Sequence, residues 1–252
     1  MPADTSPTGL RVIVTGAAGG IGRALVETLA ACDCRVGAAD VAEPPPDGAV
    51  ATAAFDVSDA GAAADGVASL VEQLGGCDAI VANAGVVDTI HRAERFPEKA
   101  WRRDLETNLS GAFHVTKAAF GALADSGDGR VVLVSSVAAE IGLPGQAAYG
   151  ASKAGIVGLA RTLAAEWASR GVRCNVVMPG MIATPKVLAM PEDLRDALTD
   201  AIPLGRLGAT EELAGAVCFL LSPAAAYVTG TVLRVDGGFG LAGTAMVGGR
   251  RR

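Results

Sequence analysis

Metal-ligating side chains are scarce in this 252-residue sequence. It has only two histidines, His91 and His114, and no Cys-x-x-Cys or His-Glu-x-x-His spacing, so we expect no metal site built from such ligands. The cysteine count is odd, and Cys32 and Cys34 are too close together for an ordinary structural disulfide. We therefore expect free thiols, which suit a reducing cytoplasm. The five cysteines are Cys32, Cys34, Cys77, Cys174 and Cys218.

An excess of positive charge is also missing. The chain has 21 Lys and Arg residues against 27 Asp and Glu residues, a formal net charge of −6. Such a chain is a poor electrostatic match for a nucleic-acid backbone or an anionic membrane surface, so we expect neither as a partner. The one basic run is Arg250–Arg252, which we interpret as part of a solvated tail.

No uninterrupted hydrophobic run is long enough to span a membrane. The best candidate, 213–233, is solidly apolar only over 213–221, because Ser222-Pro223 and Thr229-Gly230 break the rest. Residues 1–9 contain Asp4 and two prolines and no apolar run, so we expect no secretory signal. The sequence therefore predicts a soluble, cytoplasmic protein with flexible tails at 1–9 and 241–252.

Half of the residues are hydrophobic, and they are arranged as short apolar runs alternating with helical segments. This alternation predicts βαβ units, and hence an α/β fold with one doubly wound Rossmann-type domain over 1–252. Its parallel β-sheet would be flanked by helices on both faces. We expect strands at 11–15, 34–40, 50–55, 79–81, 130–135, 173–178 and 231–235, and helices at 21–31, 60–74, 97–123, 149–170 and 210–221.

A glycine-rich turn follows the first predicted strand, with the sequence Thr-Gly-Ala-Ala-Gly-Gly-Ile-Gly from Thr15 to Gly22. Glycines at such a turn let the backbone approach a pyrophosphate that faces a helix N-terminus. The string fits two spacings, T-G-x-x-x-G-x-G and T-G-x-x-G-x-x-G. Asp40 ends the second strand, where a carboxylate can accept hydrogen bonds from the ribose hydroxyls of NAD and repel a 2′-phosphate. Because no Arg or Lys stands in the turn or at 41–42, the sequence favours NAD over NADP.

Tyr149 and Lys153 form a Y-x-x-x-K pair, which places a phenol and an ammonium on one face of a helix. A nearby cation favours the phenolate, so we expect the pKa of Tyr149 to be lowered from its usual value near 10. Such a tyrosine is a candidate acid and base for a hydroxyl or carbonyl group. The serine pair Ser135-Ser136 follows the preceding strand, thirteen residues upstream of Tyr149.

With these motifs the chain resembles the short-chain dehydrogenase/reductase family, in its compact single-domain branch, from about Arg11 to Gly240. Further matching pieces are Asp56-Val57, Asn83-Ala84-Gly85, 108–111, 173–175, 179–184 and 235–238. The chain departs from the family at Ala82, where an asparagine is usual, and this puts local hydrogen bonding in doubt more than the chemistry.

The resemblance implies a catalytic tetrad of Asn108, Ser136, Tyr149 and Lys153. Ser136 would hydrogen-bond the reacting oxygen, Tyr149 would exchange its proton, and Lys153 would hold the nicotinamide ribose. Asn108 would anchor a water that relays protons. The implied cofactor is NAD, bound by Gly16, Ala18, Gly20, Ile21, Gly22, Asp40, Asp56, Val57, Asn83, Ala84, Gly85, Tyr149, Lys153, Pro179, Gly180, Ile182 and Thr184.

The resemblance also implies a small-molecule substrate, a secondary alcohol or its ketone, and a homotetramer or homodimer. The segments that would form the substrate pocket follow Gly85, Ser136 and Thr184, the last as a lid over 185–203. We expect substrate contacts from Ser136, Ala138, Glu140, Gln146, Tyr149 and Met181, with Val86, Val87, His91, Ile141, Leu143 and Met190 nearby.

Other classes of function fit less well. A serine hydrolase is disfavoured because Gly150–Ala154 only approaches the G-x-S-x-G motif and both histidines precede Ser152. A non-catalytic NAD-binding regulatory protein could share the fold, but the intact Ser136, Tyr149 and Lys153 argue against it. An NADP-dependent ketone reductase of the same fold stays open as the alternative.

Overall fold

Seven parallel strands form one sheet in the part of the chain that this computed structural model describes, residues 4–42 and 46–241. The order across the sheet is β3-β2-β1-β4-β5-β6-β7, so the chain winds outward in both directions from β1 and β4. The predicted doubly wound Rossmann-type sheet is confirmed. The strands are Arg11–Thr15 (β1), Arg35–Asp40 (β2), Ala49–Ala54 (β3), Ala79–Ala82 (β4), Gly129–Val134 (β5), Val172–Pro179 (β6) and Val232–Val235 (β7).

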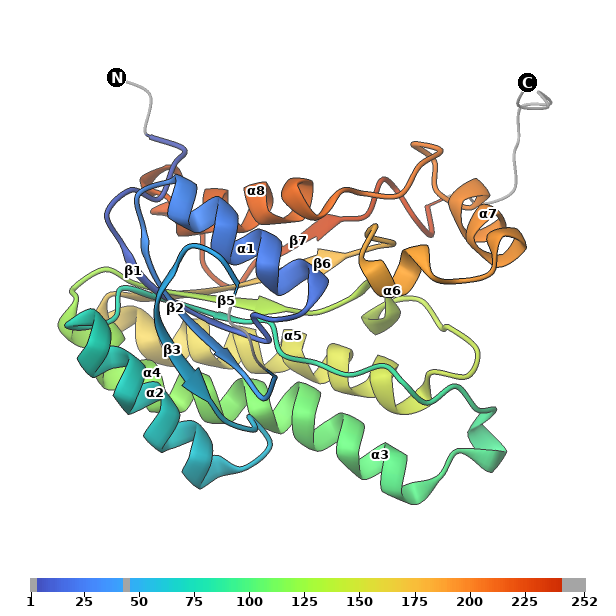
Figure 1. Ribbon diagram of the computed structural model, residues 1–252, viewed down its shortest axis with the longest axis horizontal. Coiled ribbons are helices and arrows are strands. Elements are labelled where there is room, and N and C mark those ends of the chain that lie inside the picture. The colour runs from blue at the N-terminus through green and yellow to red at the C-terminus, as the bar shows by residue number, and fades with distance from the viewer. Residues whose placement is uncertain (1–3, 43–45, 242–252) are drawn as a thin grey trace.

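Helices cover both faces of this sheet, as predicted (Figure 1). On one face lie α1 (Gly20–Ala31) and α8 (Thr210–Leu221), and on the other lie α2 (Ala60–Leu74), α4 (Gly111–Asp125) and α5 (Ala147–Trp167). The strands are apolar on both sides because each side packs against helices, which divides the core into two clusters. Ile13, Ile80 and Leu133 belong to one cluster, whereas Val12, Val81 and Val132 belong to the other.

The predicted helix 97–123 is wrong as a single helix. Helix α3 (Glu98–Leu105) is followed by a π-helical segment, Glu106–Ser110, and α4 then continues to Asp125. A π-helical turn accommodates one extra residue in a helix and is common at functional sites. Here it contains Asn108, whose side chain is fully buried between α5 and the segment that follows β4.

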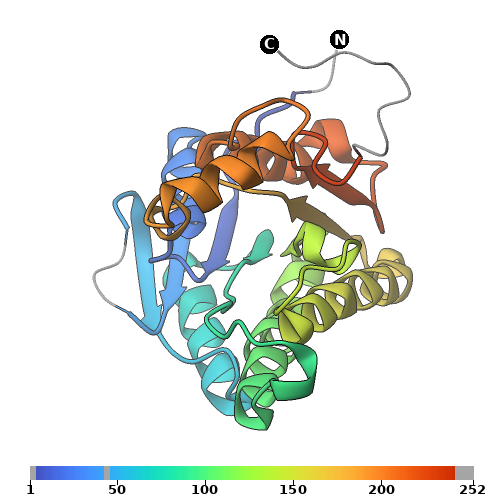
Figure 2. The same ribbon diagram turned by 90° about the vertical axis from the view of Figure 1, so that its right-hand side faces the viewer.

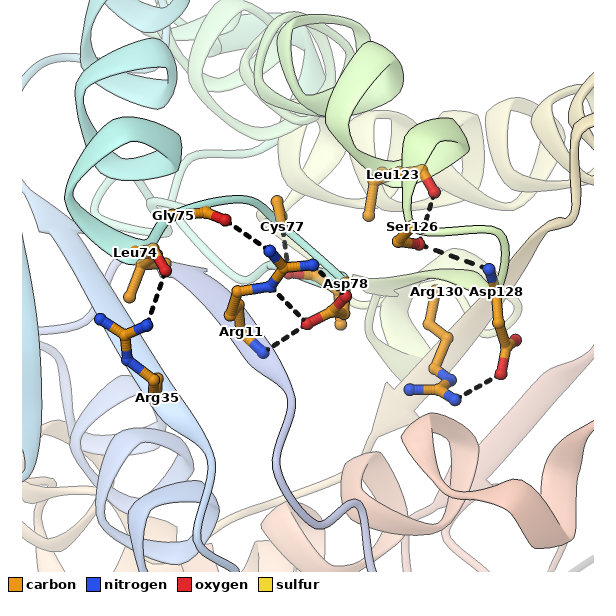
Figure 3. Close-up of polar contacts among 11 residues, drawn as sticks. Arg11, Arg35, Leu74, Gly75, Cys77, Asp78, Leu123, Ser126, Asp128 and Arg130 are labelled. Atoms are coloured by element: carbon orange, nitrogen blue, oxygen red, sulfur yellow. Dashed lines mark hydrogen bonds and ion pairs between the residues drawn. The ribbon is translucent and has the colours of Figure 1, made fainter.

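Arginines at the amino ends of the strands bind the carboxyl ends of the helices. Arg11 and Arg35 donate hydrogen bonds to the carbonyl oxygens of Gly75 and Leu74 at the end of α2 (Figure 3). Arg173, the second residue of β6, donates a hydrogen bond to the carbonyl oxygen of Leu220 in the last turn of α8. Neither α2 nor α8 has a basic residue in its own last turn. The strand arginines therefore supply the positive charge that a helix C-terminus favours.

A lid segment, 185–203, lies at the carboxyl ends of the strands. It contains two short helices, α6 (Pro185–Leu188) and α7 (Glu192–Asp200). In Figure 2 this segment (orange) faces the segments that follow β4 (teal) and β5 (yellow-green). None of the helices in the described ranges is long and apolar enough to cross a bilayer.

All five cysteines lie in the described ranges and are free thiols, as predicted. Of the predicted tails, residues 1–3 and 242–252, including Arg250–Arg252, lie outside the described residues. Within 4–9, the hydroxyl of Ser6 donates to Cys32 Sγ, and Cys34 Sγ donates to the carbonyl of Pro7. This part of the predicted tail is therefore packed against the end of α1.

Candidate functional site

A cleft of about 900 Å³ runs along the carboxyl ends of the strands. Residues at the ends of β1, β2, β3, β4, β5 and β6 contribute to its wall. In a doubly wound sheet this edge is where ligands bind. Of the residues predicted to bind the cofactor, those that line the cleft are Gly16, Ala18, Gly20, Ile21, Gly22, Asp40, Asp56, Val57, Asn83, Ala84, Gly85, Tyr149, Lys153, Pro179 and Thr184.

Gly180 and Ile182 lie behind this wall. A Cβ on Gly180 would come within 2.7 Å of Asp236 Cβ, so its backbone packs directly against the segment that follows β7. Ile182 is 4% exposed and pairs with Gly208 in an isolated bridge. These contacts hold in place the part of the cleft wall that leads from β6 to the lid segment.

The space around each glycine of the turn shows which of the two spacings allowed by the sequence is correct. A Cβ on Gly20 would lie 2.8 Å from Pro185 Cδ and 3.1 Å from Thr184 Cβ. A Cβ on Gly19 would meet nothing closer than the Gly16 carbonyl oxygen, at 3.5 Å. Gly16 has a φ of +65°, and its Cβ would come within 2.7 Å of the Ala84 backbone. Gly16, Gly20 and Gly22 are therefore the required glycines, and the spacing is T-G-x-x-x-G-x-G.

The N-terminus of α1 faces the cleft without a side-chain cap. Gly19 is its N-cap residue, and the first turn contains no acidic side chain. The first N–H groups of a helix lack partners within the helix, and together with the helix dipole they favour an anion. This turn can accept the pyrophosphate of a dinucleotide because its backbone is uncovered by side chains.

Asp40 is fixed at the far side of the same turn. One carboxylate oxygen accepts the N–H of Ala18 at 2.8 Å and the other accepts the N–H of Ala42 at 3.0 Å. Each carboxylate oxygen has a second lone pair that these bonds leave available for a ligand hydroxyl. Arg23, which the sequence analysis overlooked, donates from Nε to the Ala18 carbonyl oxygen at 3.0 Å. The Arg23 guanidinium therefore contacts Ala18, the residue whose N–H also binds Asp40.

Asn83 connects the glycine turn to the end of β4. Its Nδ2 donates to the carbonyl oxygens of Thr15 and Gly16, at 3.0 and 3.1 Å. Thr15 Oγ1 in return accepts the backbone N–H groups of Asn83 and Ala84, both at 3.2 Å. The side chain of Asn83 thus positions the turn. Ala82, where the family usually has asparagine, is 4% exposed in the apolar core.

Asn108, Ser136, Tyr149 and Lys153 come from three neighbouring elements. Ser136 is the N-cap residue of the 3-10 helix Val137–Ala139 after β5, and Tyr149 and Lys153 lie on α5. Lys153 Nζ donates to the carbonyl oxygen of Val134 at 2.8 Å and lies 5.7 Å from the centroid of the Tyr149 ring. A Cβ on Gly85 would lie 3.2 Å from Asn108 Oδ1 and 3.3 Å from Lys153 Nζ. Asn108 and Lys153 therefore converge on Gly85.

The amide of Asn108 is fully hydrogen-bonded within the protein. Its Oδ1 accepts the N–H of Val86 at 2.7 Å, and its Nδ2 donates to the Val86 carbonyl and to Ser152 Oγ. Ser152 also donates to the Tyr149 carbonyl, while Ser135 donates to the Lys153 carbonyl. These two serines brace α5 beside the tetrad, a role that no sequence motif indicated.

The pKa values of the Tyr149–Lys153 pair differ from the sequence-based expectation. Burial raises the pKa of Tyr149 above 10.0, and a contact with the Ser136 hydroxyl only partly offsets this effect. Burial also lowers the pKa of Lys153 from 10.5 to about 8. The predicted lowering of the tyrosine pKa is therefore wrong for this structure. The reason is that removal from water disfavours both charged forms and is the largest cause of each shift.

The residues predicted to contact substrate are divided between the cleft and a small core. Val86 and Val87 line the cleft, whereas Ile141, Leu143 and Met181 pack against a small core of Val137, Met178, Ile202 and Phe239. Ala138 is 7% exposed beside this core. Gln146 is the N-cap residue of α5, His91 donates its backbone N–H to Gly145, and Met190 follows α6. The carboxylate of Glu140 is bonded to Arg234.

An ion pair that the sequence analysis did not foresee joins the lid segment to the rim of the cleft. Lys186 Nζ on α6 lies 2.5 Å from Asp88 Oδ1 and 3.1 Å from the carbonyl oxygen of Val87. The attraction of Lys186 lowers the pKa of Asp88 below 3.8. Both residues line the cleft. They are 98 positions apart in the sequence, which explains why no local pattern indicated the contact.

Known proteins resemble this chain along nearly its whole length. The family profile described as enoyl-(acyl carrier protein) reductase matches residues 16–240. The 3-oxoacyl-(acyl-carrier-protein) reductase FabG of Escherichia coli (strain K12) is 38% identical over 236 residues, covering 90% of this chain and 95% of that protein. The (3R)-3-hydroxyacyl-CoA dehydrogenase of Homo sapiens is 38% identical over 252 residues, covering 90% and 94%. The crystal structure of gox2181 superimposes with a TM-score of 0.89 at 34% identity, covering 94% and 98%.

The two adjacent glycines of the turn provide a matched pair of variants. Gly20→Ala should lower the free energy of unfolding by roughly 1–3 kcal/mol, because the new methyl group overlaps Pro185 and Thr184. Gly19→Ala should lower it by at most about 1 kcal/mol, because a Cβ there meets nothing closer than 3.5 Å and only the poorer N-capping by alanine remains. Urea unfolding of the two variants measures the difference. Equal destabilisation by both would contradict the assigned spacing.

Tyr149 can be titrated alone in a Tyr227→Phe variant, because the chain has two tyrosines and Tyr227 is fully exposed. The midpoint of the tyrosinate absorbance of this variant should lie above pH 10, since burial raises the pKa of Tyr149. Adding Ser136→Ala should move the midpoint higher, because the Ser136 contact lowers that pKa. Circular dichroism at each pH confirms that the protein is still folded. A midpoint below pH 10 in the folded protein would show that Lys153 dominates instead.

Proposed function

The chain belongs to the short-chain dehydrogenase/reductase family, and from this we propose that it is an NAD-dependent oxidoreductase that interconverts a secondary alcohol and its ketone. Relatives named as dehydrogenases and reductases support hydride-transfer chemistry with a nicotinamide cofactor. The observation that carries the proposal is the position of Tyr149 and Lys153, which line the same cleft as the glycine turn and Asp40. A group bound at the turn would thus extend toward the phenol.

The residues present fit a dinucleotide. The turn at Gly16 and Gly20 leaves no space for a Cβ, so that a pyrophosphate would meet backbone alone at the N-terminus of α1. Asp40 would accept the hydroxyls of the adenosine ribose, and Lys153 would donate to the nicotinamide ribose. When bound, the nicotinamide ring supplies the hydride acceptor for oxidation and the hydride donor for reduction.

Tyr149 is the proposed acid and base. In alcohol oxidation the phenolate takes the hydroxyl proton while the carbon gives up a hydride, so that the products are a ketone, NADH and a proton. In reduction the phenol donates that proton to the developing alkoxide. Ser136, next to the phenol, would hydrogen-bond the same oxygen and orient it. Asn108 holds the backbone at Val86 and α5 in register, and its role in anchoring a relay water stays a prediction from the sequence.

NAD is the proposed cofactor because the carboxylate of Asp40 would repel a 2′-phosphate. The alternative is an NADP-dependent ketone reductase, and one observation favours it. Arg23 Nε donates to the carbonyl oxygen of Ala18, whose N–H donates to Asp40, so a cationic side chain contacts the turn beside that carboxylate. The cofactor preference depends on whether the Asp40 carboxylate or the Arg23 guanidinium is nearer to the 2′ position of the ribose. Kinetic measurements with NAD and NADP decide this.

The carbon skeleton of the proposed substrate is apolar near the reacting carbon. Val86 and Val87 line the cleft on the side of Tyr149, and the core behind Ser136 is also apolar. Two curated relatives are named for 3-oxoacyl and 3-hydroxyacyl compounds. A substrate panel should therefore include 3-hydroxyacyl thioesters beside simple aliphatic and alicyclic secondary alcohols. Tetramer formation and a cytoplasmic location stay predictions from the sequence.

Tyr149→Phe tests the proposed reaction. The substitution keeps the ring and removes the phenol hydroxyl with its exchangeable proton, so kcat should fall about 10²- to 10⁴-fold while NADH binding stays within about twofold. Tyr227→Phe is the matched control, because it removes a fully exposed phenol and should leave turnover unchanged. Turnover is measured at the absorbance of NADH over the alcohol panel, and NADH binding by its fluorescence. Substantial turnover in Tyr149→Phe would overturn the assigned acid and base.

Asp40→Ser tests the cofactor preference. Losing a charged acceptor for the ribose hydroxyls should reduce kcat/KM for NAD about tenfold and raise the relative rate with NADP. Arg23→Leu in the same background separates the two charges, because it should cancel any gain with NADP if the guanidinium attracts the phosphate. Higher kcat/KM of the unaltered protein with NADP would show that the NADP alternative is correct.

A further inference from the structure

Arg234, on the edge strand β7, binds three separate groups. Its Nη1 lies 2.6 Å from Glu140 Oε2, its Nε donates to Asp236 Oδ2 at 2.7 Å, and its Nη2 donates to the Phe239 carbonyl oxygen at 2.6 Å. A guanidinium presents donors in a fixed plane, so three simultaneous bonds determine its orientation. Arg234 therefore joins the loop after β5 to the segment after β7.

On one side of Arg234 is the loop that begins at Ser136. The 3-10 helix Val137–Ala139 follows Ser136 directly, and Glu140 is its C-cap residue. The hydroxyl of Ser136 accepts the N–H of Ala138, so its orientation depends on this short helix. Only the three residues of this short helix separate Ser136 from Glu140, and a displacement of Glu140 is thus transmitted to the serine.

On the other side is the segment 236–240, which supports the lid segment. Gly237 accepts the backbone N–H of Leu204 at 3.1 Å, and Phe239 packs with Ile202 and Val137 in the small core. Asp236, whose side chain is 7% exposed, accepts the N–H of Gly238 with its second oxygen. The end of the lid segment, the C-terminal segment and the loop of Ser136 thus meet at Arg234.

We propose that Arg234 and Glu140 are positioning residues, which hold the Ser136 loop against segment 236–240 and thereby set the substrate-binding end of the cleft. This rests on the proposed function. It also gives Glu140 a role different from the substrate contact expected from the sequence, because its carboxylate is committed to Arg234. Neither residue lines the cleft where the cofactor would bind, so the pair acts on the substrate and not on NAD.

The Glu140–Arg234 pair contributes little to global stability, because its side chains are 45% and 29% exposed and partly exposed ion pairs are weak. Its effect on the position of Ser136 is larger, because small misplacements of a group that contacts the reacting atoms are costly. Loss of the pair should therefore change kinetics more than the melting temperature.

Four variants of the full chain test this. Glu140→Ala removes the carboxylate, Glu140→Gln keeps an acceptor for Nη1, and Arg234→Lys keeps the charge but not the planar donors. Glu212→Gln is the matched control, since Glu212 is 46% exposed and pairs with Arg206 at the start of α8. Hydrogen exchange of the backbone amides is measured for 137–141 and 236–240, together with KM, kcat and the Kd of NADH.

In Glu140→Ala, exchange should become faster in both segments, KM for the alcohol should rise about fivefold, and the Kd of NADH should stay within about twofold. Glu140→Gln should restore much of the KM, Arg234→Lys should affect both segments, and Glu212→Gln should change none of these quantities. Faster exchange in only one segment, an unchanged KM, or a parallel loss of NADH affinity would overturn the proposal. If the unaltered protein turned over no alcohol, the proposed function would fail, and the exchange data alone would decide whether Glu140 couples the two segments.

Discussion

Coverage of the parallel sheet on both faces is the constraint on which the rest of the structure depends. Apolar side chains on both sides leave little place for a polar group in the middle of a strand, so most polar residues of the site lie at the strand ends. The carboxyl ends carry the glycine turn, Asp40 and the tetrad, and the amino ends carry arginines that bind helix termini. Asn175 in β6 is an exception, and its buried amide is bonded to the carbonyl oxygen of Val228 and the N–H of Thr231.

The carboxyl edge has two halves that are stabilised differently. Around the glycine turn, backbone groups and short side chains such as Thr15 and Asn83 make the contacts, so this half is close-packed and depends on small residues. At the other half, longer charged side chains connect segments distant in the sequence, as in Lys186–Asp88 and Arg234–Glu140. Charged contacts of this kind can form and break more readily than a packed backbone. Under the proposed function, the close-packed half would hold the cofactor and the half with charged contacts would bind the substrate.

Sequence reasoning predicted the fold and the cleft because both depend on local patterns. Short apolar runs that end in Gly16, Asp40 or Asn83 identify strand ends, and strand ends in a parallel sheet meet at one edge. It did not predict the π-helical segment within 97–123, because one extra residue in a helical turn leaves the apolar pattern nearly unchanged. It also predicted the wrong direction for the pKa shift of Tyr149. The spacing between Tyr149 and Lys153 is visible in the sequence, but the burial of both side chains is not. Arg234 and Glu140 are 94 residues apart, beyond any local pattern.

The arginines at the amino edge have a consequence for how the chain folds. The last carbonyls of α2 are bound by Arg11 and Arg35, which precede that helix in the chain and lie on β1 and β2. Arg11 and Gly75 are 64 residues apart, so this cap cannot form by local contacts within the helix. An isolated helix of about fifteen residues is marginal in water. Completion of α2 is therefore coupled to the pairing of β1 with β2, and this coupling makes helix and sheet formation cooperative.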